Sequence, residues 1–249
     1  MGAWDQDGYG VRVDWGPAGA RRLAPHVACL VVVDVLSFTT AVSVATDAGT
    51  TVYPYAWRDE TAAAYADAVG AQLAVGRGAA SARSPWSLSP AALRAAPVTP
   101  RLVLPSPNGS AIAAAASGDP AVAVVAGCLR NAAAVGRWLT ASGYGTADRP
   151  VAVVPAGERW PDGSLRPALE DLLGAGAIVE ALNAAHLSPE AVAARAAADA
   201  APDLAATLRD CASGRELIAY GFPDDVDIAA ERDASDVVPV LAGGGFSPA

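Results

Sequence analysis

The distribution of hydrophobic and polar positions along the chain predicts alternating strands and helices. The run 27–35 is almost wholly apolar and rich in Val, which is typical of a central strand buried on both faces. Apolar runs at 101–105, 121–126 and 150–155 are each followed by a helical stretch rich in Ala. This alternation predicts an α/β fold with three layers, in which helices cover both faces of a largely parallel or mixed sheet.

Shorter runs predict the rest of the fold. The segment 76–100 is rich in Gly, Ser, Pro and Arg, so we expect an irregular connection there. We expect the last residues, 243–249, to be disordered. Further strands are expected at 11–15, 51–55, 71–76 and 237–241, and helices at 38–48, 58–70, 109–117, 130–141, from about 167, and over most of 189–220.

Two prolines set local expectations. Pro54 interrupts the strand 51–55 and favours an edge position for it, because Pro has no N–H to donate to a neighbouring strand. Gly16 and Pro17 predict a loop after the first strand. The length of 249 residues suits a single α/β domain, and the spacing of the βα units allows two related halves, roughly 1–100 and 101–249.

Polar and small residues occur at four junctions between a predicted strand and the helix that follows it. These junctions lie at 31–40, 101–110, 123–132 and 151–158. Open α/β sheets bind ligands at the carboxyl ends of their strands, where helices begin. The free backbone N–H groups of a helix N-terminus suit anions, and phosphate in particular. The sequence therefore predicts an anion site formed by these junctions.

Carboxylates at these junctions are the candidate catalytic groups and metal ligands. Asp34 ends a buried strand, where it could hold Mg²⁺, act as a base, or cap the next helix. Glu170 and Asp171 open a helix, and the helix dipole accounts for one acid there more readily than for two. We therefore assign Asp34, Glu170 and Asp171 as catalytic residues and as ligands of Mg²⁺.

Amides, hydroxyls and one cation at the same junctions are candidates for substrate binding. Each has a plainer interpretation as a cap or a turn residue. Next to free backbone donors, however, these groups could also cradle phosphate oxygens. The candidates are Thr39, Thr40, Asn108, Gly109, Ser110, Arg130 and Asn131.

The composition excludes several classes of function. All 17 basic residues are Arg, so Schiff-base chemistry and a phosphate-binding lysine are excluded. The net charge of −9 argues against nucleic acid as a partner. Three scattered cysteines indicate reduced thiols, and neither a signal peptide nor a membrane span is evident. We expect a cytoplasmic protein that does not bind membranes, and the Ala-rich helices are compatible with a homodimer.

The motifs DVLSFTT, PSPNGS, GCLRNA and LEDLLGAGAIV occur in this order over most of the chain. Together with the segment from Gly221 to Asp233, they resemble the ComB-like family of 2-phosphosulfolactate phosphatases. The resemblance implies an α/β fold and a Mg²⁺-dependent acid phosphatase. It implies hydrolysis of 2-phosphosulfolactate, a small phosphorylated acid, on the route to coenzyme M. The positions that match its motifs are Asp34, Thr39, Thr40, Asn108, Gly109, Asn131, Glu170 and Asp171.

The sequence departs from this family at two places. Ser37 stands where the family typically has Arg, and Gly76-Arg77-Gly78 lacks the Glu of a family loop. Arg77, Arg83 and Arg130 are candidates to supply the missing cation. An alternative hypothesis is therefore a catalytically impaired member that binds a small anionic metabolite. A purely structural protein is less favoured, because polar residues recur at equivalent strand ends.

Overall fold

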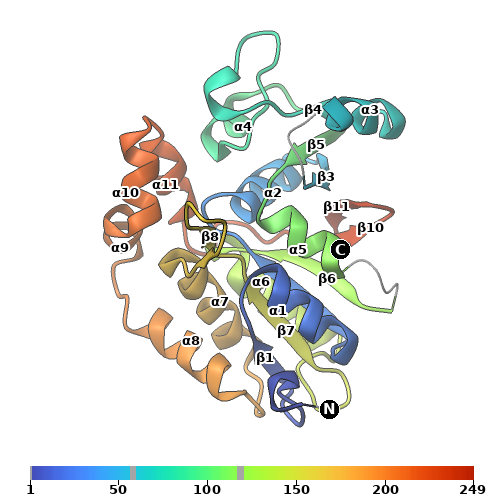
Figure 1. Cartoon of the computed structure of the whole chain (residues 1–249), viewed down its shortest axis with the longest axis vertical. Helices are drawn as coiled ribbons and strands as arrows, with labels where there is room; N and C mark the ends of the chain where they lie inside the picture. Colours follow the sequence, from blue (N-terminus) through green and yellow to red (C-terminus); the bar gives the residue numbers. More distant parts are fainter. Residues whose placement is uncertain (1, 57–59, 117–120) are drawn as a thin grey trace.

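The computed structural model describes residues 2–56, 60–116 and 121–249. Within them, nine strands form one sheet in the order β1-β7-β2-β6-β10-β11-β3-β5-β4, and β8 and β9 form a separate hairpin (Figure 1). The strands are β1 Val11–Val13, β2 Cys29–Val33, β3 Thr51–Tyr55, β4 Gln72–Leu73, β5 Arg101–Pro105, β6 Ala123–Gly127, β7 Val151–Pro155, β8 Glu158–Arg159, β9 Leu165–Arg166, β10 Pro239–Ala242 and β11 Gly245–Pro248.

Helices cover both faces of the large sheet. They are α1 Gly16–Leu23, α2 Phe38–Asp47, α3 Glu60–Val69, α4 Pro90–Ala95, α5 Gly109–Ala116, α6 Ala132–Ala141, α7 Leu169–Leu182, α8 Pro189–Asp199, α9 Leu204–Asp210, α10 Ala212–Ala219 and α11 Pro223–Ala229. None of these helices, within the residues described, is long and apolar enough to cross a membrane.

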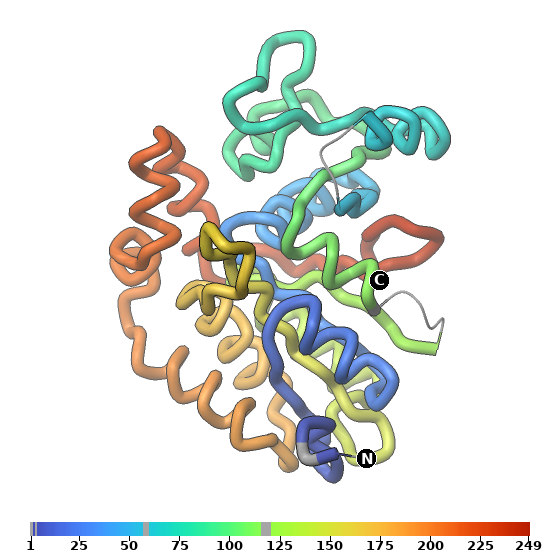
Figure 2. The backbone as a smooth tube through the Cα atoms, in the orientation of Figure 1, coloured from blue at the N-terminus to red at the C-terminus, as the bar shows by residue number. Residues whose placement is uncertain are grey.

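The hydrophobic core has two parts, one on each face of the sheet. Strand β2 is fully buried, and its successive side chains alternate between the two parts. Helices α1, α2 and α5 pack on one face, and α6, α7 and α8 pack on the other (Figure 2). The predicted three-layer α/β/α architecture is therefore confirmed, as is the central strand.

The sheet contains two parallel groups of strands that run in opposite directions. One group is β1, β7, β2 and β6, and the other is β3, β5 and β4. The hairpin β10–β11 lies between them and is antiparallel to both β6 and β3. The start of α5, which follows β5, lies beside the turn that follows β2, because Gly109 N donates a hydrogen bond to Asp34 Oδ2 at 2.9 Å.

Two expectations in the first half of the chain were wrong. Residues 16–23 form helix α1 instead of a loop, because Pro17 occupies the first turn, where its missing N–H costs nothing. Strand β3 is not at the edge of the sheet, since it lies between β11 and β5. It tolerates Pro54 because β11 pairs with β3 at Val52 and not further along.

The connection 76–100 is more ordered than expected. It contains helix α4, whose first turn is capped by Ser89 Oγ, which accepts a hydrogen bond from Ala92 N at 3.1 Å. Helix α4 packs against α2 and α11. The connection is therefore tied to the body of the protein. The predicted helices 58–70 and 109–117 are observed as α3 and α5, with residues 58, 59 and 117 outside the described part.

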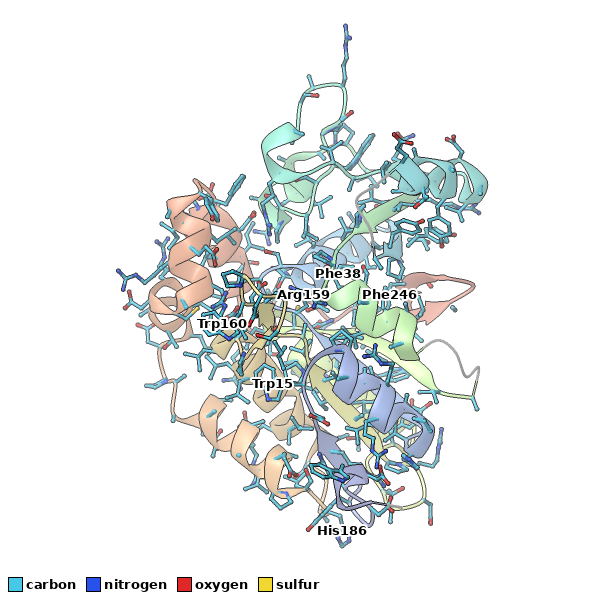
Figure 3. All side chains as sticks on the ribbon, in the orientation of Figure 1. Trp15, Phe38, Arg159, Trp160, His186 and Phe246 are labelled. Atoms are coloured by element: carbon cyan, nitrogen blue, oxygen red, sulfur yellow. The ribbon has the colours of Figure 1, made fainter. Side chains whose placement is uncertain are left out.

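The end of the chain is a strand and is not disordered. Gly243 and Gly244 both have positive φ angles, of 58° and 84°, and form the turn of the β10–β11 hairpin. Phe246 is fully buried, and its ring meets that of Phe38 edge-on at a centroid distance of 6.3 Å (Figure 3). The hairpin thus supports the first residue of α2.

This packing predicts that Phe246→Ala destabilises the protein. Truncating a fully buried aromatic ring leaves a cavity, and we expect the free energy of unfolding to fall by about 3–5 kcal/mol. Tyr220→Ala, at a side chain that is 70% exposed, is the control and should change stability by less than about 0.5 kcal/mol. Chemical denaturation measures both, and equal effects of the two substitutions would contradict the assigned packing.

Candidate active site

Asp34 lies in the turn between β2 and α2, and backbone donors hold both of its carboxylate oxygens. Oδ1 accepts a hydrogen bond from Phe38 N at 3.1 Å, and Oδ2 accepts one from Gly109 N at 2.9 Å. A Cβ on Gly109 would come within 2.8 Å of Asp34 Oδ2 and 2.4 Å of Phe38 Cδ1. Only glycine therefore allows the start of α5 to approach Asp34 this closely.

Asp171, in the first turn of α7, is held in the same manner. Its Oδ1 accepts a hydrogen bond from Val35 N at 2.7 Å, and its Oδ2 accepts one from Gly157 N at 2.8 Å. These bonds join the ends of β2 and β7 to the start of α7. The carboxylates of Asp34 and Asp171 are therefore fixed by backbone geometry, and both side chains are buried.

Two glutamates complete an acidic cluster, which we define as Asp34, Glu158, Glu170 and Asp171. Glu158, in β8, accepts a hydrogen bond on Oε2 from Asn108 Nδ2 at 3.0 Å. Glu170 is buried, and its Oε2 accepts a weak hydrogen bond from the Cys211 thiol at 3.5 Å. The structure thus brings together the three acids that the sequence singled out, with Asn108 and Gly109 beside them.

Burial and repulsion by neighbouring carboxylates raise the pKa values of Asp34, Glu158 and Asp171. Burial raises the pKa of Asp34 to about 6, and the charge of Glu170 contributes to that increase. Burial and the charges of Asp34 and Glu170 raise the pKa of Glu158 to about 7 and raise that of Asp171 well above its usual range. Four carboxylates at one place therefore carry a large electrostatic cost near neutral pH.

Two arginines partly offset this charge. The charge of Arg77 lowers the pKa of Asp34, and that of Arg166 lowers the pKa of Glu158. Arg166 lies opposite Glu158 in the register of the β8–β9 hairpin. Its Nη2 also lies 3.5 Å from Glu216 Oε2. The site therefore combines buried acids with cations at its margin.

Thr39 and Thr40 are brought to the turn after β2, but their hydroxyls bond to the backbone. Thr39 Oγ1 donates to Asp34 O at 2.8 Å and accepts from Asp34 N at 3.0 Å. Thr40 Oγ1 donates to Val35 O at 2.7 Å. Both residues are fully buried and shape the turn that carries Asp34. This arrangement does not support direct substrate binding by their hydroxyls.

Arg130 and Asn131, after β6, are engaged in a different network. The Arg130 guanidinium pairs with Glu231 and, at 3.1 Å, with Asp47. The Asn131 side chain accepts from Cys128 N at 2.9 Å and donates to two backbone carbonyls, those of Ala126 and Val237. The third junction therefore anchors the C-terminal segment, and the structure gives no support to substrate binding by these two side chains.

Ser110 faces away from the acidic cluster. It lines a cavity of about 690 Å³ together with Tyr55 and Tyr65, and none of the four acids lines that cavity. Its buried Oγ has no hydrogen-bond partner among the described residues. Cys128 is also buried, which raises the pKa of its thiol and argues against a nucleophilic role. His186 lies at the lower end of the molecule in Figure 3, away from Phe38, which lies near the middle.

No group of three or more His, Cys, Asp or Glu side chains in residues 2–56, 60–116 and 121–249 is spaced to enclose a metal ion. Mg²⁺ does not need such a group, since it usually binds one or two carboxylates and keeps water or phosphate oxygens as its other ligands. The excess negative charge of the acidic cluster is what a divalent cation would neutralise.

The comparison with family models identifies the chain. The model of the 2-phosphosulpholactate phosphatase family matches residues 20–244 of 249. The chain belongs to this family. It is therefore a phosphatase of the phosphoric monoester hydrolase class. Among curated proteins, no relative matches the chain.

Sequence reasoning did not assign three residues that this phosphatase places at or beside the site. Glu158 is the last residue of the fourth junction, 151–158, so its position shortly after an apolar strand was the available signal. Arg166 belongs to the β8–β9 hairpin. Each strand of this hairpin has only two residues, which is too short to be recognised in the sequence. Asp225 belongs to a run of nearby aspartates, Asp224, Asp225 and Asp227, that is typical of a solvated loop. Its side chain is nevertheless only 1% exposed.

The raised pKa of Glu158 predicts a pH-dependent stability of the phosphatase. The folded state keeps a proton on Glu158 up to about pH 7, whereas the unfolded chain releases it near 4.5, so stability falls as pH rises through this window. Glu158→Gln removes this cost. We expect its stability relative to wild type to increase by about 3 kcal/mol between pH 4 and pH 8.

Denaturation at several pH values measures this change. Glu190→Gln, at an exposed glutamate in the first turn of α8, is the matched control and should show no such trend. An unchanged difference between Glu158→Gln and wild type from pH 4 to pH 8 would show that Glu158 is not buried beside the other acids.

Proposed function

We propose that this phosphatase is a Mg²⁺-dependent enzyme that hydrolyses a small phosphorylated acid, 2-phosphosulfolactate or a closely related phosphoester. The observation that carries the proposal is the acidic cluster itself. Two aspartates are fixed by four backbone N–H groups where strands of both parallel groups end, and two glutamates lie beside them. The family match supports phosphomonoester hydrolysis at such a site.

The cluster fits a divalent cation. Burial and the charge of Glu170 raise the pKa values of Asp34 and Asp171, so a nearby positive charge would stabilise the ionised forms of these two aspartates. Mg²⁺ would be held by one or two of the carboxylates of Asp34, Glu170 and Asp171. When bound, it would neutralise phosphoryl charge and polarise the phosphorus–oxygen bond.

Glu158 is suited to proton transfer. Its pKa of about 7 means that it is part protonated and part ionised at neutral pH, which is the condition for a general acid or base. Asn108 donates to its Oε2 and so orients the carboxyl group. Glu158 can therefore give a proton to the leaving oxygen of the phosphoester.

Asp34 and Asp171 fix the backbone segments around the site while substrate binds. Each carboxylate bridges two segments of backbone, so neither can turn away without breaking two hydrogen bonds. Preorganised groups of this kind lower the cost of binding a charged transition state, because little reorganisation is needed. The function thus depends on backbone positions that are set by the sheet.

Phosphate release from 2-phosphosulfolactate and related phospho-acids tests the proposal. Asp34→Asn and Glu170→Gln should each lower kcat roughly 100-fold or more, because each removes a charge from the catalytic cluster. Asp199→Asn, at an exposed position at the end of α8, should retain wild-type activity. Excess chelator should abolish turnover and added Mg²⁺ should restore it.

Full activity in chelator would contradict the role of the metal. Saturable binding of phosphate without turnover of any phosphoester in the panel would instead identify the protein as an impaired member that binds a small anion.

A further inference from the structure

Arg77 is held at the margin of the acidic cluster by groups from two other parts of the chain. Its Nη2 donates to Ser37 Oγ at 2.5 Å, and its Nε donates to Asp225 Oδ2 at 3.2 Å. The guanidinium carbon lies 5.8 Å from the centre of the Phe222 ring. The side chain is 19% exposed, so it is fixed in position but open to a small ligand.

Asp225, in the first turn of α11, is the anchor of this arrangement. Its side chain is 1% exposed. Oδ1 accepts hydrogen bonds from Ser89 Oγ at 2.5 Å and from Ala91 N at 3.0 Å, while Oδ2 accepts from Arg77. A single carboxylate thus fixes both the start of α4 and the guanidinium of Arg77.

The Arg77 guanidinium lies close to the site. Ser37 belongs to the turn that carries Asp34, and the charge of Arg77 lowers the pKa of Asp34. Nη1 has no hydrogen-bond partner in the part of the chain that the structure describes. A planar guanidinium with unused N–H groups is well suited to bind two oxygens of a phosphoryl group.

We propose that Arg77 binds the phosphoryl group of the substrate and that Asp225 is a positioning residue, which acts by holding Arg77 against Ser37. This inference rests on the proposed function for the identity of the substrate. Binding of phosphate by Arg77 can still be measured whether or not the enzyme turns over a given ester.

Inorganic phosphate is the probe, and calorimetry on the full chain with Mg²⁺ measures its affinity. Arg77→Gln should raise the Kd for phosphate at least about tenfold, because it removes charge-assisted hydrogen bonds, and Arg77→Lys should restore only part of the affinity. Asp225→Asn should raise the Kd by a smaller factor. The control is Asp227→Asn, on the same helix at a 46% exposed side chain that pairs with Arg209; it should leave the Kd within about twofold.

A double mutant separates positioning from general destabilisation. If Asp225 acts through Arg77, Asp225→Asn should have little further effect on phosphate binding when Arg77→Gln is already present. A purely structural role of Asp225 would instead give the same loss in both backgrounds. That result would overturn the positioning role, and circular dichroism would verify that each variant is folded.

An unchanged Kd for phosphate in folded Arg77→Gln would overturn the proposal for Arg77, as would a wild-type protein that binds no phosphate. If Asp225→Asn does not fold, the Arg77 variants still decide whether Arg77 binds phosphate. Asp225→Glu then tests the positioning role, which requires that this variant folds and weakens phosphate binding only when Arg77 is present. Any other result with Asp225→Glu would overturn the positioning role. Phosphate binding that depends on Arg77 without hydrolysis of any ester would support the inference while contradicting the proposed function.

Discussion

The structure depends on the placement of three buried carboxylates, those of Asp34, Glu170 and Asp171, beside the half-buried carboxylate of Glu158. Ionised acids that lie this close repel one another and lose their hydration, so they require compensating donors. Backbone N–H groups of Val35, Phe38, Gly109 and Gly157 provide four such donors to Asp34 and Asp171. The cost that remains is seen in the raised pKa values of Asp34, Glu158 and Asp171.

The unusual course of the sheet explains how these donors meet. The two parallel groups of strands run in opposite directions, and the β10–β11 hairpin joins them. As a result, α5, which follows β5 of one group, begins beside Asp34, which follows β2 of the other. Phe246 of the hairpin packs on Phe38 at the start of α2, so the end of the chain stabilises the same turn.

The sequence predicted the layers and the main acids because these leave strong local signals. A continuous apolar run predicts β2, and Asp34 follows the end of this run. Glu170 and Asp171 lie at the start of a predicted helix. The roles of Arg77, Glu158 and Asp225 depend on contacts between residues that are 40 or more positions apart, such as Arg77 with Ser37 and Asn108 with Glu158. Local patterns do not encode such pairs. Thr39 and Arg130 have side chains typical of ligand-binding residues, and local patterns do not show their partners either. Thr39 Oγ1 donates to the backbone carbonyl of Asp34, and Arg130 forms an ion pair with Asp47.

The most direct test of this account is a crystal structure of the protein with Mg²⁺ and phosphate. We expect a Mg²⁺ ion about 2.1 Å from an oxygen of Asp34, Glu170 or Asp171, with a phosphate oxygen on the same ion. An ion-free acidic cluster at saturating Mg²⁺, with phosphate bound elsewhere on the protein, would contradict the account.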